Sequence, residues 1–240
     1  MARRIQACLN GARAVGFHPA LPITAEALAV DAARCAAAGV VALHIHQRDA
    51  AGEETLEPET VGAAVAAMRR AAPGLPISVS TGDWIEHDDA RQIACVRGWA
   101  ALPAEARPDE ASVNLSEPTA PAVMEALLRG GIGVEAGVAS LADLDRLLAL
   151  DLLPLCRRVL VEIDDVEPIP AEALATAILA RLDGAPERQL HGFGRSAWPM
   201  ARRAAALGLM LRLGLEDVAE LPDGGVAPGN AALVAAGLAL

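Results

Sequence analysis

Short hydrophobic runs rich in strand-forming residues alternate along the chain with longer Ala- and Leu-rich segments of helical periodicity. Runs such as Val40-Val41-Ala42-Leu43 are continuously apolar, which is typical of strands covered on both faces. The pattern predicts strands at residues 4–9, 40–46, 76–80, 111–115, 131–135, 158–163, 189–193 and 209–213. It predicts helices at residues 25–38, 58–72, 120–129, 141–150, 171–182, 199–207 and 230–238.

Strands that alternate with helices at this spacing predict parallel strands joined by right-handed crossovers. Eight strand repeats indicate an α/β fold, a (β/α)8 TIM barrel, as a single catalytic domain over residues 1–240. A doubly wound open sheet is the alternative. Thr24 and Ser140 precede two expected helices as N-caps, and Gly39 follows the first helix as a C-terminal glycine. Residues 97–110 are irregular, and we expect a helix tail and a loop there.

Charge and composition argue against several classes of function. A net charge of −11 argues against nucleic acid as a partner, because neutralisation of phosphates dominates that affinity. The sequence lacks an apolar stretch of roughly 18 residues that could span a membrane, and its start lacks the apolar run of a secretory signal. We therefore expect a cytoplasmic protein with no membrane partner. The four cysteines form no C-x-x-C pair, and we expect them to be reduced and buried.

Two residue types are absent, and their absence restricts the chemistry. All 20 basic residues are arginine, so no side chain can form a Schiff base, which excludes lysine-dependent aldolase and pyridoxal phosphate mechanisms. The chain also has no tyrosine, which removes a common general acid. Carbonyl chemistry in this protein would have to use a metal or hydrogen bonds as the electrophile.

The strongest local motif is Leu43-His44-Ile45-His46-Gln47-Arg48-Asp49, at the end of the second predicted strand. Side chains alternate along a strand, so His44 and His46 point to the same face. Two imidazoles at the C-terminal rim of a barrel make half of a metal site, and neutral nitrogens suit zinc, iron, nickel or copper. Two buried histidines bonded to backbone are the structural alternative.

The end of the eighth predicted strand offers a third ligand, in the segment Leu211-Arg212-Leu213-Gly214-Leu215-Glu216-Asp217. Strands 8 and 2 both flank strand 1 in a barrel, so Glu216 can complete a site of two histidines and one glutamate. An inward-pointing Arg212 could bind a carboxylate or orient Asp217. The alternatives are a solvated Glu-Asp pair and an outward-pointing arginine.

Polar residues that follow other strands are candidates for substrate binding, and each could instead belong to a turn or a packed layer. The candidate substrate-binding residues are Asn10, Arg13, Ser80, Thr81, Gly82, Ser112 and Asn114, and Arg195 is the candidate for an acyl-CoA phosphate. The remaining histidines have no partner at ligand spacing, and we expect structural or surface roles for His18, His87 and His191.

Taken together, these segments resemble the beta-keto acid cleavage enzymes, a family represented by 3-keto-5-aminohexanoate cleavage enzyme. The resemblance runs along nearly the whole chain. It is carried by the motifs around Asn10–Arg13, Pro19–Thr24, His44–Asp49, Ser80–Gly82, Ser112–Asn114, Gly192–Arg195 and Arg212–Asp217. Singly these motifs are weak, but in this order and at strand ends they are specific.

The resemblance implies a zinc-dependent TIM barrel that cleaves a β-keto acid with acetyl-CoA and yields acetoacetate and a new acyl-CoA. It implies that His44, His46 and Glu216 bind zinc, and that Asp217, oriented by Arg212, is the base. Ser80 and Ser112 would contact the substrate. It also implies a homo-oligomer, with a tetramer as one form.

Three features of the chain depart from the family pattern. Family members for amino-containing substrates carry an acid where this chain has Arg13, which argues for a neutral or anionic substrate tail. Two glycine-rich turns of the family are replaced here by Glu162-Ile163-Asp164-Asp165 and Ser116-Glu117-Pro118. The chain is also shorter than is usual in the family, so the contacts to the acyl-CoA are expected to differ.

Other readings of the same motifs remain. A metal-dependent hydrolase barrel also uses H-x-H, but on its first strand and with histidines from strands 5 and 6, which lack them here. A metal-dependent aldolase would cleave a keto acid without CoA. A non-catalytic protein that only binds the metal is the alternative from a different class.

Overall fold

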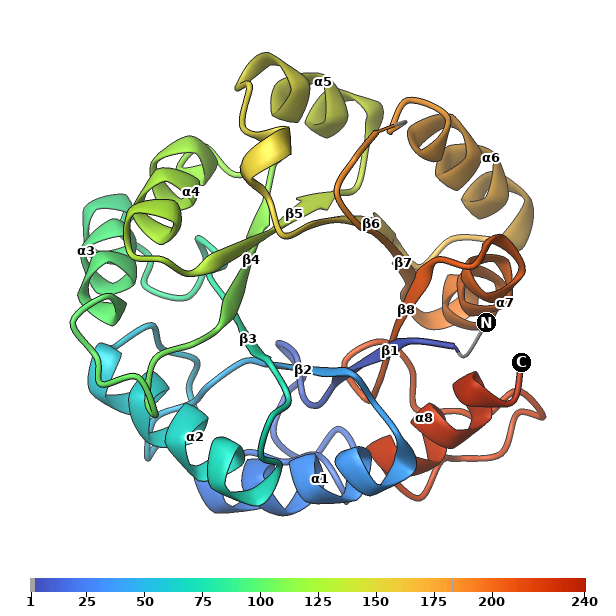
Figure 1. The fold of residues 1–240 in the computed structure, drawn as a ribbon. Coiled ribbons are helices and arrows are strands. Elements are labelled where there is room, and N and C mark those ends of the chain that lie inside the picture. Colours follow the sequence, from blue (N-terminus) through green and yellow to red (C-terminus); the bar gives the residue numbers. More distant parts are fainter. Residues whose placement is uncertain (1–2, 183) are drawn as a thin grey trace.

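A computed structural model describes residues 3–182 and 184–240, and its strands close into a parallel barrel in sequence order. Each strand pairs with its neighbours in sequence, and β1 also pairs with β8, which closes the barrel and rules out the open sheet. The helices form a ring outside the strands (Figure 1). The strands are β1 (Ile5–Cys8), β2 (Ala42–Ile45), β3 (Ile77–Ser80), β4 (Glu110–Asn114), β5 (Gly133–Val138), β6 (Arg158–Ile163), β7 (Arg188–Gly192) and β8 (Met210–Leu213). The TIM-barrel prediction is therefore confirmed.

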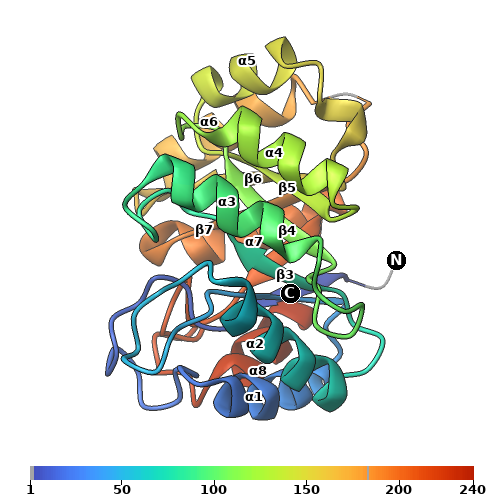
Figure 2. The same cartoon turned by 90° about the vertical axis from the view of Figure 1, so that its left-hand side faces the viewer.

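A helix follows each strand, as right-handed crossovers between parallel strands require. The side view in Figure 2 shows the helices packed along the outside of the strands. They are α1 (Ala25–Ala38), α2 (Pro58–Ala71), α3 (Asp89–Trp99), α4 (Ala120–Arg129), α5 (Leu141–Ala149), α6 (Pro168–Leu179), α7 (Ala197–Leu207) and α8 (Asn230–Leu238), with short 3-10 helices η1 (Leu153–Leu155) and η2 (Gly194–Ser196). None of the helices in this described part of the chain is long and apolar enough to cross a membrane.

Local capping explains where several helices begin and end. Thr24 Oγ1 accepts a hydrogen bond from the Ala27 amide at the start of α1, and Gly39 ends that helix in the left-handed conformation with φ 102°. The sequence pattern did not predict α3, because its exposed face is strongly polar and its apolar stripe is narrow. Asp88 is the N-cap of α3. Trp99, the last residue of α3, is fully buried, and its indole N–H donates a hydrogen bond to the Leu56 carbonyl.

The two faces of the strands differ in polarity. Residues such as Ile5, Leu43 and Ile77 belong to the hydrophobic core that includes residues of the surrounding helices. The opposite face carries polar side chains that meet inside the barrel. Gln6 of β1 donates to Glu135 of β5 at 2.7 Å, a contact across the barrel that requires both side chains to face its interior. The barrel therefore places polar chemistry at its centre, below the rim where the β-strands end.

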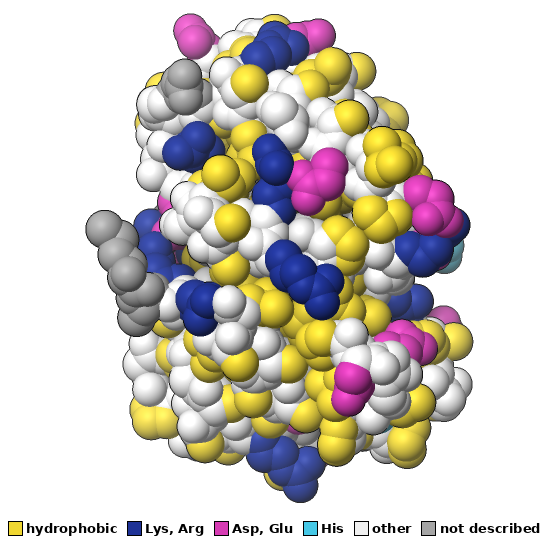
Figure 3. All heavy atoms as spheres, turned by 90° about the vertical axis from the view of Figure 1, so that its right-hand side faces the viewer, with side chains coloured by type: hydrophobic (Ala, Val, Ile, Leu, Met, Phe, Trp, Pro, Cys, Tyr) yellow, Lys and Arg dark blue, Asp and Glu magenta, His cyan; other side chains and the backbone are white. Residues whose placement is uncertain are grey.

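The outer surface near the chain termini is mixed in character. Figure 3 shows arginine side chains distributed over a surface in which hydrophobic side chains are frequent. Ile169 of α6 and Leu207 of α7 are exposed, at 84% and 52%. The homo-oligomer predicted from the sequence remains a prediction.

Candidate metal and substrate site

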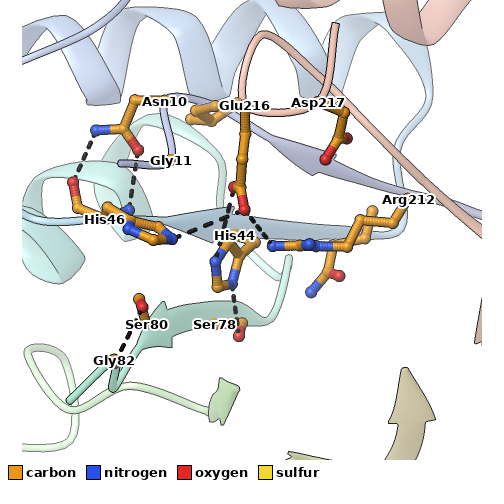
Figure 4. Close-up of polar contacts among 12 residues, drawn as sticks. Asn10, Gly11, His44, His46, Ser78, Ser80, Gly82, Arg212, Glu216 and Asp217 are labelled. Carbon is orange, nitrogen blue, oxygen red and sulfur yellow. Dashed lines mark hydrogen bonds and ion pairs between the residues drawn. The ribbon is translucent and has the colours of Figure 1, made fainter. Parts of the chain in front are cut away.

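Two histidines and one glutamate converge at the C-terminal rim of the barrel (Figure 4). His44 lies on β2 and His46 directly follows it, while Glu216 follows β8 on the far side of β1. His44 Nε2 lies 3.8 Å from Glu216 Oε2, and His46 Nε2 lies 3.7 Å from Glu216 Oε1. One ligand atom from each of the three residues lies within 4.8 Å of the others.

The three side chains fit a divalent metal ion by their own chemistry. Nε2 of His44 and Oε2 of Glu216 are buried and have no hydrogen-bond partner among the described residues. Burial, with Arg212 and the other two nearby histidines, holds the pKa of His44 well below its ordinary value. The neutral imidazole keeps a lone pair for coordination. Two imidazole nitrogens and one carboxylate, with room for further ligands, are a donor set of catalytic zinc sites.

Hydrogen bonds with the segment that follows β1 hold this arrangement in place. The Asn10 amide brackets the backbone of His46, donating to its carbonyl at 2.7 Å and accepting from its N–H at 2.9 Å. Asn10, which the sequence suggested as a substrate contact, thus positions the end of β2. Arg48 donates to the carbonyls of Gly11 and Arg13. Gly11 adopts φ +57° and lies so close to Glu216 that a Cβ would meet its Cγ at 2.3 Å.

Asp217 and Arg212 lie beside the cluster, and His191 joins them. Asp217 is fully buried, with Oδ1 3.1 Å from His191 Nδ1 and with Oδ2 lacking a partner in the part of the chain described. Arg212 donates to Glu216 Oε1 at 2.8 Å and lies 3.0 Å from His191 Nε2. The Arg212 guanidinium therefore contacts Glu216 and His191. The side chain that is hydrogen-bonded to Asp217 is His191.

The sequence analysis assigned His191 a structural or surface role, and the structure places it inside the barrel against Asp217. Burial and Arg212 lower the pKa of His191, but Asp217 and Glu162 outweigh them and raise it above its ordinary value. Glu162 Oε1 lies 3.5 Å from His191 Nε2. The signal available in the sequence was that His191 falls within the predicted strand 189–193, next to the predicted strand that carries Arg212. The register, in which Leu190 pairs with Leu211, then places His191 beside Arg212.

Glu54 is a second residue that the sequence analysis missed. Its Oε1 lies 2.5 Å from His46 Nδ1, and its Oε2 accepts from the indole N–H of Trp84 at 3.1 Å. The Trp84 ring stacks on His46, with ring centroids 6.3 Å apart. Glu54 comes eight residues after His46 in a loop, and no spacing in the sequence marks it.

The predicted substrate residues of β3 and β4 lie on the other side of the histidines. Ser80 is buried and accepts a hydrogen bond from the Gly82 N–H at 3.3 Å. Thr81 Oγ1 donates to the Ser112 carbonyl at 2.7 Å, so this hydroxyl joins the two strands. Asn114 donates to Glu117 at 2.7 Å. Burial raises the pKa of Glu117 to about 7.

A cavity of about 370 Å³ opens over His46 and Glu216. It is lined by Ala12, Arg13, His46, Trp84, Asp165, Phe193, Gly194 and Glu216. Arg13 is held by the carbonyls of Glu216 and Asp217 at 3.0 and 3.2 Å and stacks over Phe17. The cavity combines aromatic walls with one guanidinium at its rim.

Arg195, the candidate for an acyl-CoA phosphate, lies at the same rim. Its guanidinium donates to Asp165 Oδ1 at 2.8 Å and to Glu167 Oε1 at 2.7 Å. Both pairs are exposed, with the Arg195 side chain 57% accessible. A phosphate would have to displace or share these carboxylates.

A model of the beta-keto acid cleavage enzyme family matches residues 4–240. The chain belongs to the beta-keto acid cleavage enzyme family. Among curated proteins it is similar to the 3-keto-5-aminohexanoate cleavage enzyme of Fusobacterium nucleatum subsp. nucleatum, with 25% identity over 247 residues, 96% of this chain and 88% of that protein. The family suggested by the sequence motifs is confirmed.

Solved structures share the fold. The ternary complex of ObcA with a C4-CoA adduct and oxalate aligns with a TM-score of 0.70 and 18% identity, over 90% of this chain and 62% of ObcA. The chain thus spans about three fifths of the length of that protein. A type I 3-dehydroquinate dehydratase from Clostridium difficile aligns with a TM-score of 0.63 and 9% identity, over 89% of this chain and 84% of the dehydratase. At these identities the likeness shows the barrel fold of this beta-keto acid cleavage family member.

Proposed function

We propose that this member of the family cleaves a β-keto acid with acetyl-CoA as co-substrate, at a site where His44, His46 and Glu216 hold a divalent metal, preferably zinc. The observation that carries the proposal is the convergence of three donors, two of whose buried ligand atoms, Nε2 of His44 and Oε2 of Glu216, have no partner within residues 3–182 and 184–240. In an enzyme family that acts on keto acids, such a donor set suits the polarisation of a ketone. A bound zinc ion would act as a Lewis acid on the carbonyl oxygen of the substrate.

Asp217 is the general base of this proposal. Its Oδ2 has no partner among the residues described, while Oδ1 is held by His191, so the free oxygen can take the proton from the carbon between the two carbonyl groups. Arg212 holds Glu216 and His191 on either side of the base. The base and the metal-ligating residues would then act on adjacent atoms of one substrate.

The substrate carboxylate would lie against the rim of β3 and β4. Ser80, Ser112 and the Gly82 loop supply hydroxyl and amide groups there, with Thr81 joining the two strands. Asn114, held by Glu117, completes the polar wall. The Arg13 guanidinium at the cavity rim would suit a neutral or anionic tail of the substrate.

The proposed reaction exchanges two acyl groups. The substrate carbon that loses its proton to Asp217 attacks the thioester carbonyl of acetyl-CoA and forms a carbon–carbon bond. The adduct expels CoA as a thiolate when the thioester carbon–sulfur bond breaks, and this thiolate adds to the original ketone carbon. The bond between the two substrate carbons then breaks, the acyl group leaves on CoA, and Asp217 returns its proton to the departing carbon. The products are acetoacetate and a new acyl-CoA, and atoms balance without an oxidant or reductant.

Cleavage without CoA is the second candidate, and one observation favours it. The guanidinium of Arg195 is already paired with Asp165 and Glu167, two carboxylates at the rim where the CoA phosphates would approach. In support of CoA, a structural neighbour has been solved with a C4-CoA adduct, although only the fold is shared at 18% identity. An aldolase-type reaction would need the metal site and Asp217 but not the thioester.

A panel of β-keto acids tests the two candidates directly. Purified protein with measured metal content is incubated with each acid, with and without acetyl-CoA, and both acid loss and acetoacetate are measured. Acetoacetate formed only with acetyl-CoA is the expected result. Acid loss that does not depend on acetyl-CoA would establish the second candidate. Full metal occupancy without turnover of any acid would contradict both and indicate a binding protein.

A further inference from the structure

A chain of buried polar contacts leads from His44 toward the floor of the barrel. His44 Nδ1 lies 3.1 Å from Ser78 Oγ on β3, and Ser78 Oγ in turn contacts Glu135 Oε2 on β5. The other oxygen of Glu135 accepts from Gln6 at 2.7 Å and from the Arg158 guanidinium. His44 and Glu135 have side chains that are each 1% exposed, so water does not compete for these contacts.

The donors and acceptors along this chain allow one arrangement of protons. Glu135 is paired with the Arg158 guanidinium, and a carboxylate can only accept hydrogen bonds, so the single hydroxyl proton of Ser78 points to Glu135. The Ser78 oxygen is then left with lone pairs, so it accepts a hydrogen bond from the Nδ1–H of His44. His44 is therefore the Nδ1–H tautomer, and its lone pair lies on Nε2, which faces Glu216 at 3.8 Å.

His46, the other histidine, also has a partner at its Nδ1 atom, so the arrangement at His44 is repeated within the same site. His46 Nδ1 contacts the carboxylate of Glu54 directly, at 2.5 Å, and its Nε2 faces Glu216 at 3.7 Å. In both rings Nδ1 contacts an acceptor, which is Glu54 for His46 and Ser78, itself bound to Glu135, for His44. In both rings Nε2 faces Glu216. Metal-binding histidines are commonly oriented in this way, by an acceptor on the nitrogen that does not bind the metal.

We propose that Ser78 and Glu135 are positioning residues that fix the Nδ1–H tautomer of His44 and aim its Nε2 lone pair at the metal. The inference rests on the proposed function, because it assumes that His44 is a metal ligand. Glu135 acts through Ser78 and touches neither substrate nor metal. The Arg158–Glu135–Gln6 contacts keep the carboxylate in place from below.

The test compares Ser78→Ala with Ser78→Thr, which keeps the hydroxyl, and with Ser80→Ala, which removes a hydroxyl two residues along the same face. Metal-free protein labelled with ¹⁵N gives the tautomer of His44 from its ring nitrogen shifts, assigned with a His44→Gln variant. Zinc affinity is measured by competition with a coloured chelator, and thermal unfolding shows that each variant is folded. These readouts do not depend on turnover.

We expect His44 to be the Nδ1–H tautomer in the unmodified protein and in Ser78→Thr, and a mixture of tautomers in Ser78→Ala. The zinc dissociation constant should rise by about 10- to 100-fold in Ser78→Ala, and change little in Ser78→Thr and Ser80→Ala. An Nε2–H tautomer in the unmodified protein, or equal affinity in folded Ser78→Ala and Ser80→Ala, would overturn the inference. Failure of the unmodified protein to bind any divalent metal would instead overturn the proposed function.

Discussion

Gly11→Ala should weaken metal binding, because the new methyl group would occupy space that the Glu216 side chain fills. A Cβ on Gly11 would lie 2.3 Å from Glu216 Cγ, whereas carbon atoms in contact are normally about 3.5 Å apart. Glu216 would therefore have to move by roughly 1 Å, beyond the tolerance of about 0.2 Å in metal–ligand distances. We expect the zinc dissociation constant to rise by about 100-fold, the scale that such a misplacement costs elsewhere.

Gly16→Ala is the matched control for this prediction. Gly16 also has a positive φ, +88°, so both variants carry a backbone strain of about 1–2 kcal/mol, but no atom of the described part of the chain lies within 4 Å of a Cβ at Gly16. Chelator competition gives the zinc affinity, and urea unfolding gives the stability of each variant. Gly11→Ala should lose more stability than Gly16→Ala, because the clash with Glu216 adds to the backbone strain, and Gly11→Ala alone should lose affinity. Equal zinc affinity in both folded variants would refute the position assigned to Glu216.

Three further predictions follow from the site. Glu117→Gln should leave stability unchanged near pH 4.5 and increase it as pH rises: the pKa of Glu117 is raised by burial from 4.5 to about 7, so its ionisation costs up to about 3 kcal/mol above pH 7. Urea unfolding between pH 4.5 and 8 measures this, and a gain that does not grow with pH contradicts it. Glu216→Gln should bind far less zinc by metal analysis while keeping its circular dichroism spectrum, and full occupancy would remove Glu216 from the ligand set. Asp217→Asn should keep its metal and lose turnover by at least about 100-fold; full turnover on a keto acid that the unmodified protein cleaves would show that Asp217 is not the base.

The alternation of apolar strands with helical segments was enough to predict the barrel, because each element is encoded by neighbouring residues. The same holds for the pair His44 and His46, whose common face follows from the two-residue period of a strand. Even Glu216 could be assigned, since closure of an eight-stranded barrel places the ends of β8 and β2 on either side of β1. These features depend on local pattern and on one topological rule.

The partners of those residues were decided by the tertiary structure. His191 meets Asp217, Ser78 joins His44 to Glu135, and Glu54 reaches His46 from a loop. Each contact depends on strand register, on the inward direction of a side chain or on the path of a loop, and none leaves a recurrent spacing in the sequence. The sequence by itself determined the barrel and the candidate ligands, because periodicity and strand ends are local properties. Only the closed barrel decided which buried groups hold those ligands, because it brings together residues that are distant along the chain.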